Sequence, residues 1–512
     1  MSGAILELDS FPGRGPVEDS ADVVIVGTGA GGATAARVLA EAGLDLILIE
    51  EGPPVKTAEL RSDMYSAFKS FWRDMGFQVA EGRAFTPVLQ GRCVGGTTVI
   101  NGAIMHRMPE AIHGAWRDEF GVSDVLTYAA LNRVYDQLDR ELHVGTAPEP
   151  VVGNNNALMR AGVERLGLRG NLIRRNVHDC QGSGHCNQGC PTARKQSMDV
   201  SYVPRALAAG ARVYATCRAD RVRIERGRAI GVEARFRDPL GRREGPLVRV
   251  HARHAVILAA SAIQTPLLLQ ASGVGKSSRL VGRRLQTHPG SGMMGVFDRP
   301  VNVWFGATQG YETTHYWGER MKFESVGMPL EVAAARLPGL GPAALEEMAD
   351  FDRLAIWGVQ VRAEAHGSVR QAPFGGAQIK FDMTSADLER LKLGLFRVAE
   401  MMFAAGARAV MPAVHGLPDR VHSVDEMRKV FDVPPDPRHF HCIAAHLFGT
   451  ALMGRGPSSS VVAPDGQVHE VKDLYVADSS VFPTNMGVNP QHTICAVAWL
   501  FAERLADRIA RA

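Results

Sequence analysis

A glycine-rich turn near the start of the chain constrains the fold most strongly. Residues 27–32 read GTGAGG, directly after a short apolar run at residues 21–26. A helical stretch follows at residues 31–42 and stops at Gly43, and residues 46–49 form a second apolar run. Short apolar runs are typical of strands buried on both faces. A strand, a helix and a strand in this order predict a parallel sheet in an α/β fold.

Three glycines of this turn have predicted roles. Gly27 permits the tight turn, Gly29 lets the backbone approach a pyrophosphate, and Gly32 lets the helix pack closely on the strand. The helix N-terminus attracts the negative charge of the pyrophosphate. Glu50 ends the second strand, 23 residues after Gly27, where a carboxylate accepts the ribose hydroxyls. The pattern therefore predicts a dinucleotide site, and it does not separate FAD from NAD.

Further apolar runs late in the chain predict a discontinuous domain. Residues 255–260 and 474–477 are expected to be buried strands, and residues 493–510 a closing helix. We expect a nucleotide-binding domain at residues 20–290 and 450–512, with insertions around 55–90 and 106–195. A second domain is expected at residues 291–449. Its aromatic and methionine residues include Trp304, Phe305, Tyr311, Tyr316, Trp317, Met321, Phe323 and Met328.

The composition excludes several classes of protein. The 57 basic and 54 acidic residues give a net charge of +3, which offers no electrostatic reason to expect a nucleic-acid partner. The first twenty residues lack the apolar run of a secretory signal, and no apolar run is long enough for a transmembrane segment. Seven cysteines in 512 residues are too few for a disulfide scaffold. We therefore expect a cytoplasmic protein.

Three further segments, together with the turn, resemble the glucose–methanol–choline (GMC) family of FAD-dependent oxidoreductases. They read GRCVGGTTVINGAIMHR at residues 91–107, SAIQTPLLLQASGVG at 261–275, and HLFGTALMG at 446–454 followed by LYVADSSVFPTNMGVNPQHTI at 474–494. The resemblance covers the chain from about residue 20 onward and includes VGRRLQTHPG at 281–290. It implies a Rossmann-like FAD-binding domain, with an inserted substrate domain built on an antiparallel sheet with helices.

The same resemblance implies FAD, with its flavin ring facing a substrate pocket. In the family a loop passes along the flavin, and Asp478 is expected to reach the ribityl chain. Some relatives attach the flavin covalently through a histidine where this chain has Ile100, so we expect non-covalent binding. The expected cofactor contacts are Gly27, Gly29, Gly32, Glu50, Arg92, Gly95, Gly96, Asn101, Gly102, Ala103, Ala219, Ala260, Asp478 and Pro490.

Oxidation of an alcohol through a flavin removes a proton from the hydroxyl and a hydride from the carbon. A neutral imidazole is suited to accepting the proton. The family places a histidine at the start of H-x-x-G-T, which here is His446, and a second histidine or an asparagine before the last helix, which here is Asn489. The resemblance therefore implies that His446 is the general base. Asn489 would orient the substrate oxygen and stabilise its developing charge.

The other histidines near these motifs have alternative interpretations. His492 lies three residues after Asn489, and it is either a second catalytic residue or a structural residue at the start of the helix. The structural interpretation is favoured. His288 and His441 are expected to be packed or surface residues.

Three cysteines form the pattern C-x5-C-x3-C-P and leave three interpretations open. Cys180, Cys186 and Cys190 resemble the spacing in GMC glucose dehydrogenases that carry an iron–sulfur cluster. Zinc would require a fourth ligand, for which the candidates are Cys217, His185 and His178. The interpretation with the largest weight is three reduced thiols in a packed loop.

The segments at 186–208 and 321–329 resemble the long-chain alcohol oxidase branch more than the sugar oxidases. The aromatic and methionine residues of the second domain suit a fatty, aryl or sterol-like alcohol, or else they form that domain's core. Oxygen or an electron carrier would then re-oxidise the flavin. The alternative functions are a sugar or glycoside dehydrogenase that passes electrons through an iron–sulfur cluster, a flavin-containing hydroxynitrile lyase, and a flavin-binding protein without turnover.

Overall fold

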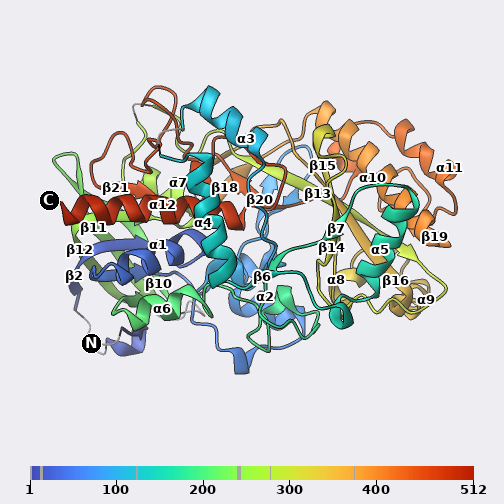
Figure 1. The fold of residues 1–512 in the computed structure, drawn as a ribbon, viewed down its shortest axis with the longest axis horizontal. Coiled ribbons are helices and arrows are strands. Elements are labelled where there is room, and N and C mark those ends of the chain that lie inside the picture. Colours follow the sequence, from blue (N-terminus) through green and yellow to red (C-terminus); the bar gives the residue numbers. More distant parts are fainter. Residues whose placement is uncertain are drawn as a thin grey trace.

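Two sheets of different kinds organise the molecule, and they lie side by side along its longest axis (Figure 1). The computed structural model describes residues 3–11, 15–122, 125–238, 244–276, 278–373 and 375–511. The first sheet has eight strands and contains the glycine-rich turn, and the second has seven strands and contains the middle of the chain.

The first sheet is mixed, with a parallel half around the turn. Its order is β1-β9-β3-β2-β12-β11-β10, and β21 also pairs with β12. Pairing is parallel from β1 to β12 and for β21, and antiparallel from β12 to β10. This arrangement confirms the predicted α/β fold class. The strands are β1 Ile5–Leu6, β2 Val17–Val26, β3 Leu46–Ile49, β9 Arg212–Tyr214, β10 Cys217–Glu225, β11 Arg228–Arg237, β12 Glu244–Leu258 and β21 Leu474–Val476.

The helices beside this sheet follow the sequence pattern, with small shifts at their ends. Helix α1 (Ala30–Glu41) packs against α12 (Gln491–Ala510) and α6 (Tyr202–Ala208). The predicted strand at 255–260 is wrong at both ends, because β12 starts earlier and stops at Leu258. Ala260 is instead the N-cap of α7 (Ser261–Ala271). Helix α12 likewise begins two residues before the predicted residue 493, directly after Pro490.

The second sheet is antiparallel and confirms the predicted sheet type of the substrate domain. Its order is β19-β13-β16-β15-β14-β7, and β20 also pairs with β13. Helices α10 (Ser385–Ala405) and α5 (Asn154–Arg165) pack together against it (Figure 1). The strands are β7 Asn171–Leu172, β13 Gln286–Val296, β14 Tyr311–Thr313, β15 Met321–Ser325, β16 Leu354–Val361, β19 Ala409–Met411 and β20 Ile443–Phe448.

Two strands of this sheet lie outside the predicted second domain. Strand β7 comes from the expected insertion at 106–195, and β13 starts at Gln286, before residue 291. The domain bounds themselves stay a prediction. The remaining α-helices are α2 Met64–Phe71, α3 Glu110–Ala115, α4 Tyr128–Glu141, α8 Leu330–Ala334, α9 Pro342–Ala349 and α11 Val424–Met427.

Two smaller sheets complete the described strands. One contains β17, β18, β4 and β5, and the other contains β6 and β8. Within the described ranges, none of the helices has both the length and the apolar content needed to cross a membrane. The strands are β4 Val79–Glu81, β5 Thr86–Pro87, β6 Val144–Gly145, β8 Arg175–Asn176, β17 Ser368–Gln371 and β18 Ala377–Lys380.

Candidate active site

A cavity of about 1020 Å³ is lined by residues of both large sheets. The structure brings most of the predicted site residues to this one cavity. Those in its lining are Gly27, Gly29, Glu50, Gly96, Asn101, Gly102, Ala219, Ala260, His446, Asp478, Asn489 and Pro490. The predicted residues outside the described lining are Gly32, Arg92, Gly95 and Ala103.

The glycine-rich turn leaves the start of helix α1 open toward the cavity. Gly29 is the N-cap of α1, and a Cβ atom added there would meet no described atom within 4 Å. A Cβ atom at Gly32 would instead lie 2.0 Å from the carbonyl oxygen of Gly27. Gly32 therefore serves helix packing, as predicted, whereas Gly29 leaves room at a helix end that favours negative charge.

Glu50 lies beside this turn with both carboxylate oxygens occupied by hydrogen bonds. Thr28 donates to Oε2 from its backbone nitrogen at 3.0 Å and from its hydroxyl at 2.7 Å, and the Gly52 nitrogen donates to Oε1 at 2.9 Å. Burial raises the pKa of Glu50. The Thr28 hydroxyl also accepts a hydrogen bond from the Gly95 nitrogen at 3.0 Å. Thr28, which occupies an unconstrained position of the glycine pattern, thus connects the predicted ribose acceptor to the predicted flavin loop.

A buried lysine holds the loop that the sequence predicts along the flavin. Lys195 is 1% exposed, and its Nζ donates to the carbonyl oxygens of Val99 at 2.5 Å and Asn101 at 3.1 Å. It also donates to the carbonyl oxygen of Cys186 at 2.8 Å. These bonds fix the backbone on both sides of Ile100. Sequence reasoning missed Lys195, because the hydrophobic pattern treats a lysine as exposed.

The three cysteines of the C-x5-C-x3-C-P pattern are free and are not gathered around one point. Arg175 Nη2 donates to the Cys186 sulfur at 3.0 Å, while its Nε donates to the Gly102 carbonyl oxygen at 2.8 Å. Burial opposes ionisation, yet Arg175 and Lys195 lower the pKa of the Cys186 thiol. Among the described residues, no three His, Cys, Asp or Glu side chains are grouped as a metal site. The predicted ligand set for a cluster is therefore not assembled.

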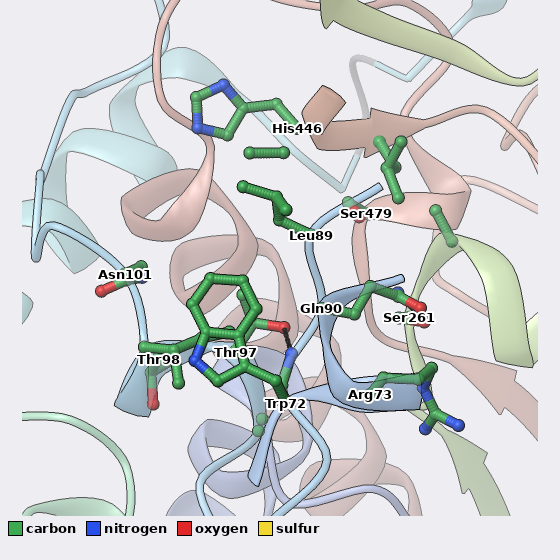
Figure 2. Close-up of a pocket in the computed structure, with 18 of the residues that line it drawn as sticks. Trp72, Arg73, Leu89, Gln90, Thr97, Thr98, Asn101, Ser261, His446 and Ser479 are labelled. Carbon is green, nitrogen blue, oxygen red and sulfur yellow. Dashed lines mark hydrogen bonds between the residues drawn. The ribbon is translucent and has the colours of Figure 1, made fainter. Parts of the chain in front are cut away.

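The two predicted catalytic residues, His446 and Asn489, meet in the wall of the cavity. His446 lies on β20 and Asn489 lies in the segment between β21 and α12, with His446 Nε2 3.4 Å from Asn489 Nδ2. Figure 2 shows the His446 ring across the pocket from Asn101, Thr97 and Thr98. Burial lowers the pKa of His446 to about 4, partly opposed by Glu324. The imidazole is therefore neutral at physiological pH and able to accept a proton.

A second histidine contacts His446. His288 on β13 is 2% exposed, lines the cavity, and places Nδ1 3.2 Å from His446 Nδ1. Burial and the neighbouring His446 hold the pKa of His288 well below its usual range. His288 was predicted to be a packed or surface residue; it is buried, but it also lines the cavity, and its contact with His446 was missed. Its place in the THPG segment of the family resemblance was the available signal. The exposed His441 also lines the cavity.

His492 lies away from this pair. It is fully buried, with its ring 4.6 Å from the ring of Tyr135 and its Nε2 3.4 Å from Asp139. Burial lowers its pKa to about 3. His492 is outside the described lining of the cavity, and its packing against α4 agrees with the structural interpretation.

A buried network of charged side chains contacts Asn489. Lys322 is 1% exposed, and its Nζ lies 2.9 Å from Glu312 Oε2, 2.7 Å from Glu324 Oε2 and 2.7 Å from Asn489 Oδ1. His106 Nε2 lies 2.7 Å from Glu312 Oε2 on the far side. Burial opposes the charge on Lys322, yet Glu312 and Glu324 raise its pKa above the ordinary value. This network was missed, although Lys322 and Glu324 belong to the segment that resembles alcohol oxidases.

The remaining wall of the cavity is largely apolar. It comes mainly from α2, α8, β16, β20 and the segment after β15, and not from the aromatic side chains of residues 304–323. Trp304 and Phe305 are partly exposed, and Tyr311, Met321 and Phe323 belong to the second core. Of the eight residues named from the sequence, Met328 lines the cavity. The apolar lining includes Met64, Phe68, Trp72, Leu89, Val326, Met328, Val332, Ile356, Val359, Ile443 and Leu447.

Sequence profiles of known families match most of the chain. The profiles of the amino- and carboxyl-terminal parts of GMC oxidoreductases match residues 21–290 and 364–498. The chain belongs to the GMC oxidoreductase family. It is therefore a flavoprotein oxidoreductase that acts on CH–OH groups.

The chain is also similar to individual members of the family. An uncharacterized GMC-type oxidoreductase of Mycobacterium tuberculosis is 34% identical over 99% of this chain and 78% of its own length. A long-chain-alcohol oxidase of Arabidopsis thaliana is 28% identical over 95% of this chain and 66% of its own length. The fold is similar to that of pyridoxine 4-oxidase from Mesorbium loti, with a TM-score of 0.70, 19% identity and coverage of 94% of this chain and 98% of that chain.

Proposed function

We propose that this GMC oxidoreductase oxidises an apolar alcohol, of fatty, aryl or sterol-like character, to an aldehyde or ketone. The observation that carries the proposal is the neutral, partly buried His446 beside Asn489, 3.4 Å apart, in the wall of a cavity that also contains the nucleotide turn. A proton acceptor and an amide donor at one point suit a substrate hydroxyl.

The cofactor in this proposal is FAD, bound without a covalent link. Two features of the cavity fit it: the open start of α1 at Gly29 for a pyrophosphate, and the Glu50 carboxylate for a ribose. Asp478, Ala219 and the loop at residues 95–103 would supply further contacts. When bound, FAD supplies the acceptor for the hydride of the carbinol carbon.

In this proposal two side chains bind the hydroxyl group of the substrate. His446 accepts the hydroxyl proton at Nε2, and the Asn489 Nδ2 group donates a hydrogen bond to the substrate oxygen. Apolar side chains such as Phe68, Trp72 and Val326 line the same cavity, and an apolar substrate packed against them would displace water. Exclusion of water strengthens the hydrogen bond from Asn489 to a developing negative charge.

The apolar wall and the 28% identity to a long-chain-alcohol oxidase both favour an apolar substrate over a sugar. The contact of Cys186 with Arg175, and the separation of the three cysteines, do not favour the dehydrogenase with an iron–sulfur cluster. Oxygen and an electron carrier are the two candidate acceptors.

The test is an anaerobic absorbance spectrum of the purified holoenzyme before and after addition of 1-decanol. We expect the flavin bands to bleach at low alcohol concentration, and glucose to bleach them far less. Bleaching by glucose alone would overturn the proposed substrate class. Stable flavin bands with every alcohol, together with cleavage of a cyanohydrin, would assign the chain to the lyases.

A further inference from the structure

The Lys322 ammonium has a fixed set of partners. Its three protons face three acceptors, namely Glu312 Oε2 at 2.9 Å, Glu324 Oε2 at 2.7 Å and Asn489 Oδ1 at 2.7 Å. Gln309 and Gln360 donate to the other oxygen of Glu324 at 2.9 and 2.6 Å, which holds that carboxylate in place. The ammonium therefore cannot turn away from Asn489 without leaving a buried carboxylate unpaired.

His288 favours one tautomer of His446. The backbone nitrogen of Gly487 donates to His288 Nε2 at 2.9 Å, so a neutral His288 carries its proton on Nδ1. That proton faces His446 Nδ1, 3.2 Å away. A neutral His446 that accepts it has its own proton on Nε2, the atom that faces Asn489. In this tautomer His446 cannot accept a hydroxyl proton at Nε2.

The Asn489 amide favours the other tautomer. Because Lys322 donates to Oδ1, the NH₂ end of the amide faces His446 Nε2 at 3.4 Å. An Nε2–H would meet a second N–H there, whereas an Nε2 lone pair would accept from it. Rotating the amide by half a turn would bring its NH₂ group against the Lys322 ammonium, so the ion network blocks that rotation.

We infer that Lys322 is a positioning residue that acts through Asn489 to keep His446 Nε2 unprotonated. The inference rests on the proposed function, in which His446 accepts the hydroxyl proton. It gives a role to the buried charges of Lys322, Glu312 and Glu324. Removal of a hydride does not itself require these charges. Lys322 selects the base-competent tautomer against the preference imposed by His288.

The test is the ring nitrogen spectrum of holoenzyme labelled with [15N]histidine, without substrate, because protonated and unprotonated ring nitrogens differ widely in chemical shift. His446 signals are identified by their loss in His446→Gln. We expect the Nδ1–H tautomer in the wild type and the Nε2–H tautomer in Lys322→Met. The charge-balanced double variant Lys322→Met with Glu312→Gln removes one charge of each sign, and should show the same change if the single variant does not fold.

The matched control is Lys392→Met. Lys392 is another buried lysine, 2% exposed, whose Nζ donates to the carbonyl oxygens of Phe431 and Val433 in the substrate domain. This variant should keep the wild-type tautomer of His446. The Lys322 variants should reduce their flavin with 1-decanol at least about tenfold more slowly than the control, because a misplaced proton disables a general base.

Two results would overturn the inference: an Nε2–H tautomer in the wild type, or an unchanged tautomer in both Lys322 variants. The failure of the proposed function is a separate outcome. In that case the tautomer changes as expected, but no alcohol reduces the wild-type flavin. The amide orientation would then stand and the reaction would need reassignment.

Discussion

At Gly29 we expect the absence of a side chain to serve cofactor binding rather than folding. A Cβ atom there would project into open space within the cavity. Gly29→Val should therefore fold with a near-normal melting temperature but lose FAD, since its methyl groups occupy the space beside the helix N-terminus. The ratio of flavin absorbance to protein absorbance measures this.

Gly145→Val provides the control for Gly29→Val. Gly145 also has no described atom within 4 Å of an added Cβ, and it lies outside the described lining. It should keep its flavin. A yellow Gly29→Val protein with full FAD content would contradict the assigned role of Gly29.

His446 should determine the rate of flavin reduction and its response to acid. His446→Ala should keep FAD and lower the anaerobic reduction rate by about 10²–10⁴-fold, the usual contribution of a general base. Because the pKa of His446 lies at about 4, the wild-type rate should stay level from pH 8 down to about 5 and fall as the pH approaches 4. Stopped-flow reduction across this pH range measures both effects.

His441→Ala is the control for His446→Ala, because His441 also lines the cavity without a described contact to the catalytic pair. It should reduce its flavin at close to the wild-type rate. A wild-type rate that falls near pH 6.5 instead would show that an ordinary histidine, not a desolvated one, takes the proton.

At the scale of elements, the loop at residues 95–103 depends on a side chain distant in sequence. Lys195→Met would leave the carbonyl oxygens of Val99 and Asn101 without their buried donor, at a cost of about 1–3 kcal/mol for each unsatisfied group. We expect a lower melting temperature and a weaker hold on FAD. Thermal unfolding and FAD release on dilution measure these two effects.

Lys392→Met is the control for Lys195→Met. It removes a buried lysine of α10 that donates to the carbonyl oxygens of Phe431 and Val433. It should lower the melting temperature while retaining FAD. Equal FAD loss in both variants would mean that general destabilisation, and not the flavin loop, explains the effect of Lys195→Met.

The elements that the sequence predicted well are those with one dominant signal. The parallel strands β3 and β21 are continuous apolar runs, β2 ends in the apolar run VVIV, and the glycine turn marks the start of α1. Strand β15 had no such signal: its sequence MKFES contains two charged residues, yet all five residues are buried. Lys322 can be buried because it pairs with Glu312 and Glu324. This pairing depends on tertiary contacts, so the periodicity of the sequence does not predict it.

The same limit applies to the candidate site. Motif resemblance identified His446 and Asn489, because each lies within a run of characteristic residues. His288, Lys195 and Thr28 act through contacts with residues far away in the chain, so their roles depend on the fold. The C-terminal end of β12 was missed for a local reason, since Ala260 is the N-cap of α7 yet continues the apolar run of the strand.

Across the whole molecule, buried neutral histidines should make stability depend on pH. Burial lowers the pKa of His446 to about 4 and that of His492 to about 3. An unfolded histidine titrates near pH 6.5, so the unfolded chain binds these protons first. The free energy of unfolding should therefore fall as the pH drops from about 6.5 toward 4. The raised pKa values of the buried Glu50 and Asp478 act in the opposite direction.

Melting temperatures between pH 8 and pH 4 measure this dependence. They should be level above about pH 7 and decline below 6.5. His492→Phe keeps an aromatic ring against Tyr135 and removes one of the titrating groups, so its decline should be shallower. A melting temperature that rises between pH 6.5 and pH 5 would contradict the argument.

The last residues of β12 pair with two strands that are far away in the chain. Val256–Leu258 lie between β2, which precedes β12 by more than two hundred residues, and β21, which follows it by a similar number. During synthesis a ribosome releases these strands in that order, so the FAD cradle stays incomplete until residues 474–510 have emerged. Asn489 belongs to this last portion. We therefore expect the cofactor to bind only after these residues have emerged and joined the first sheet.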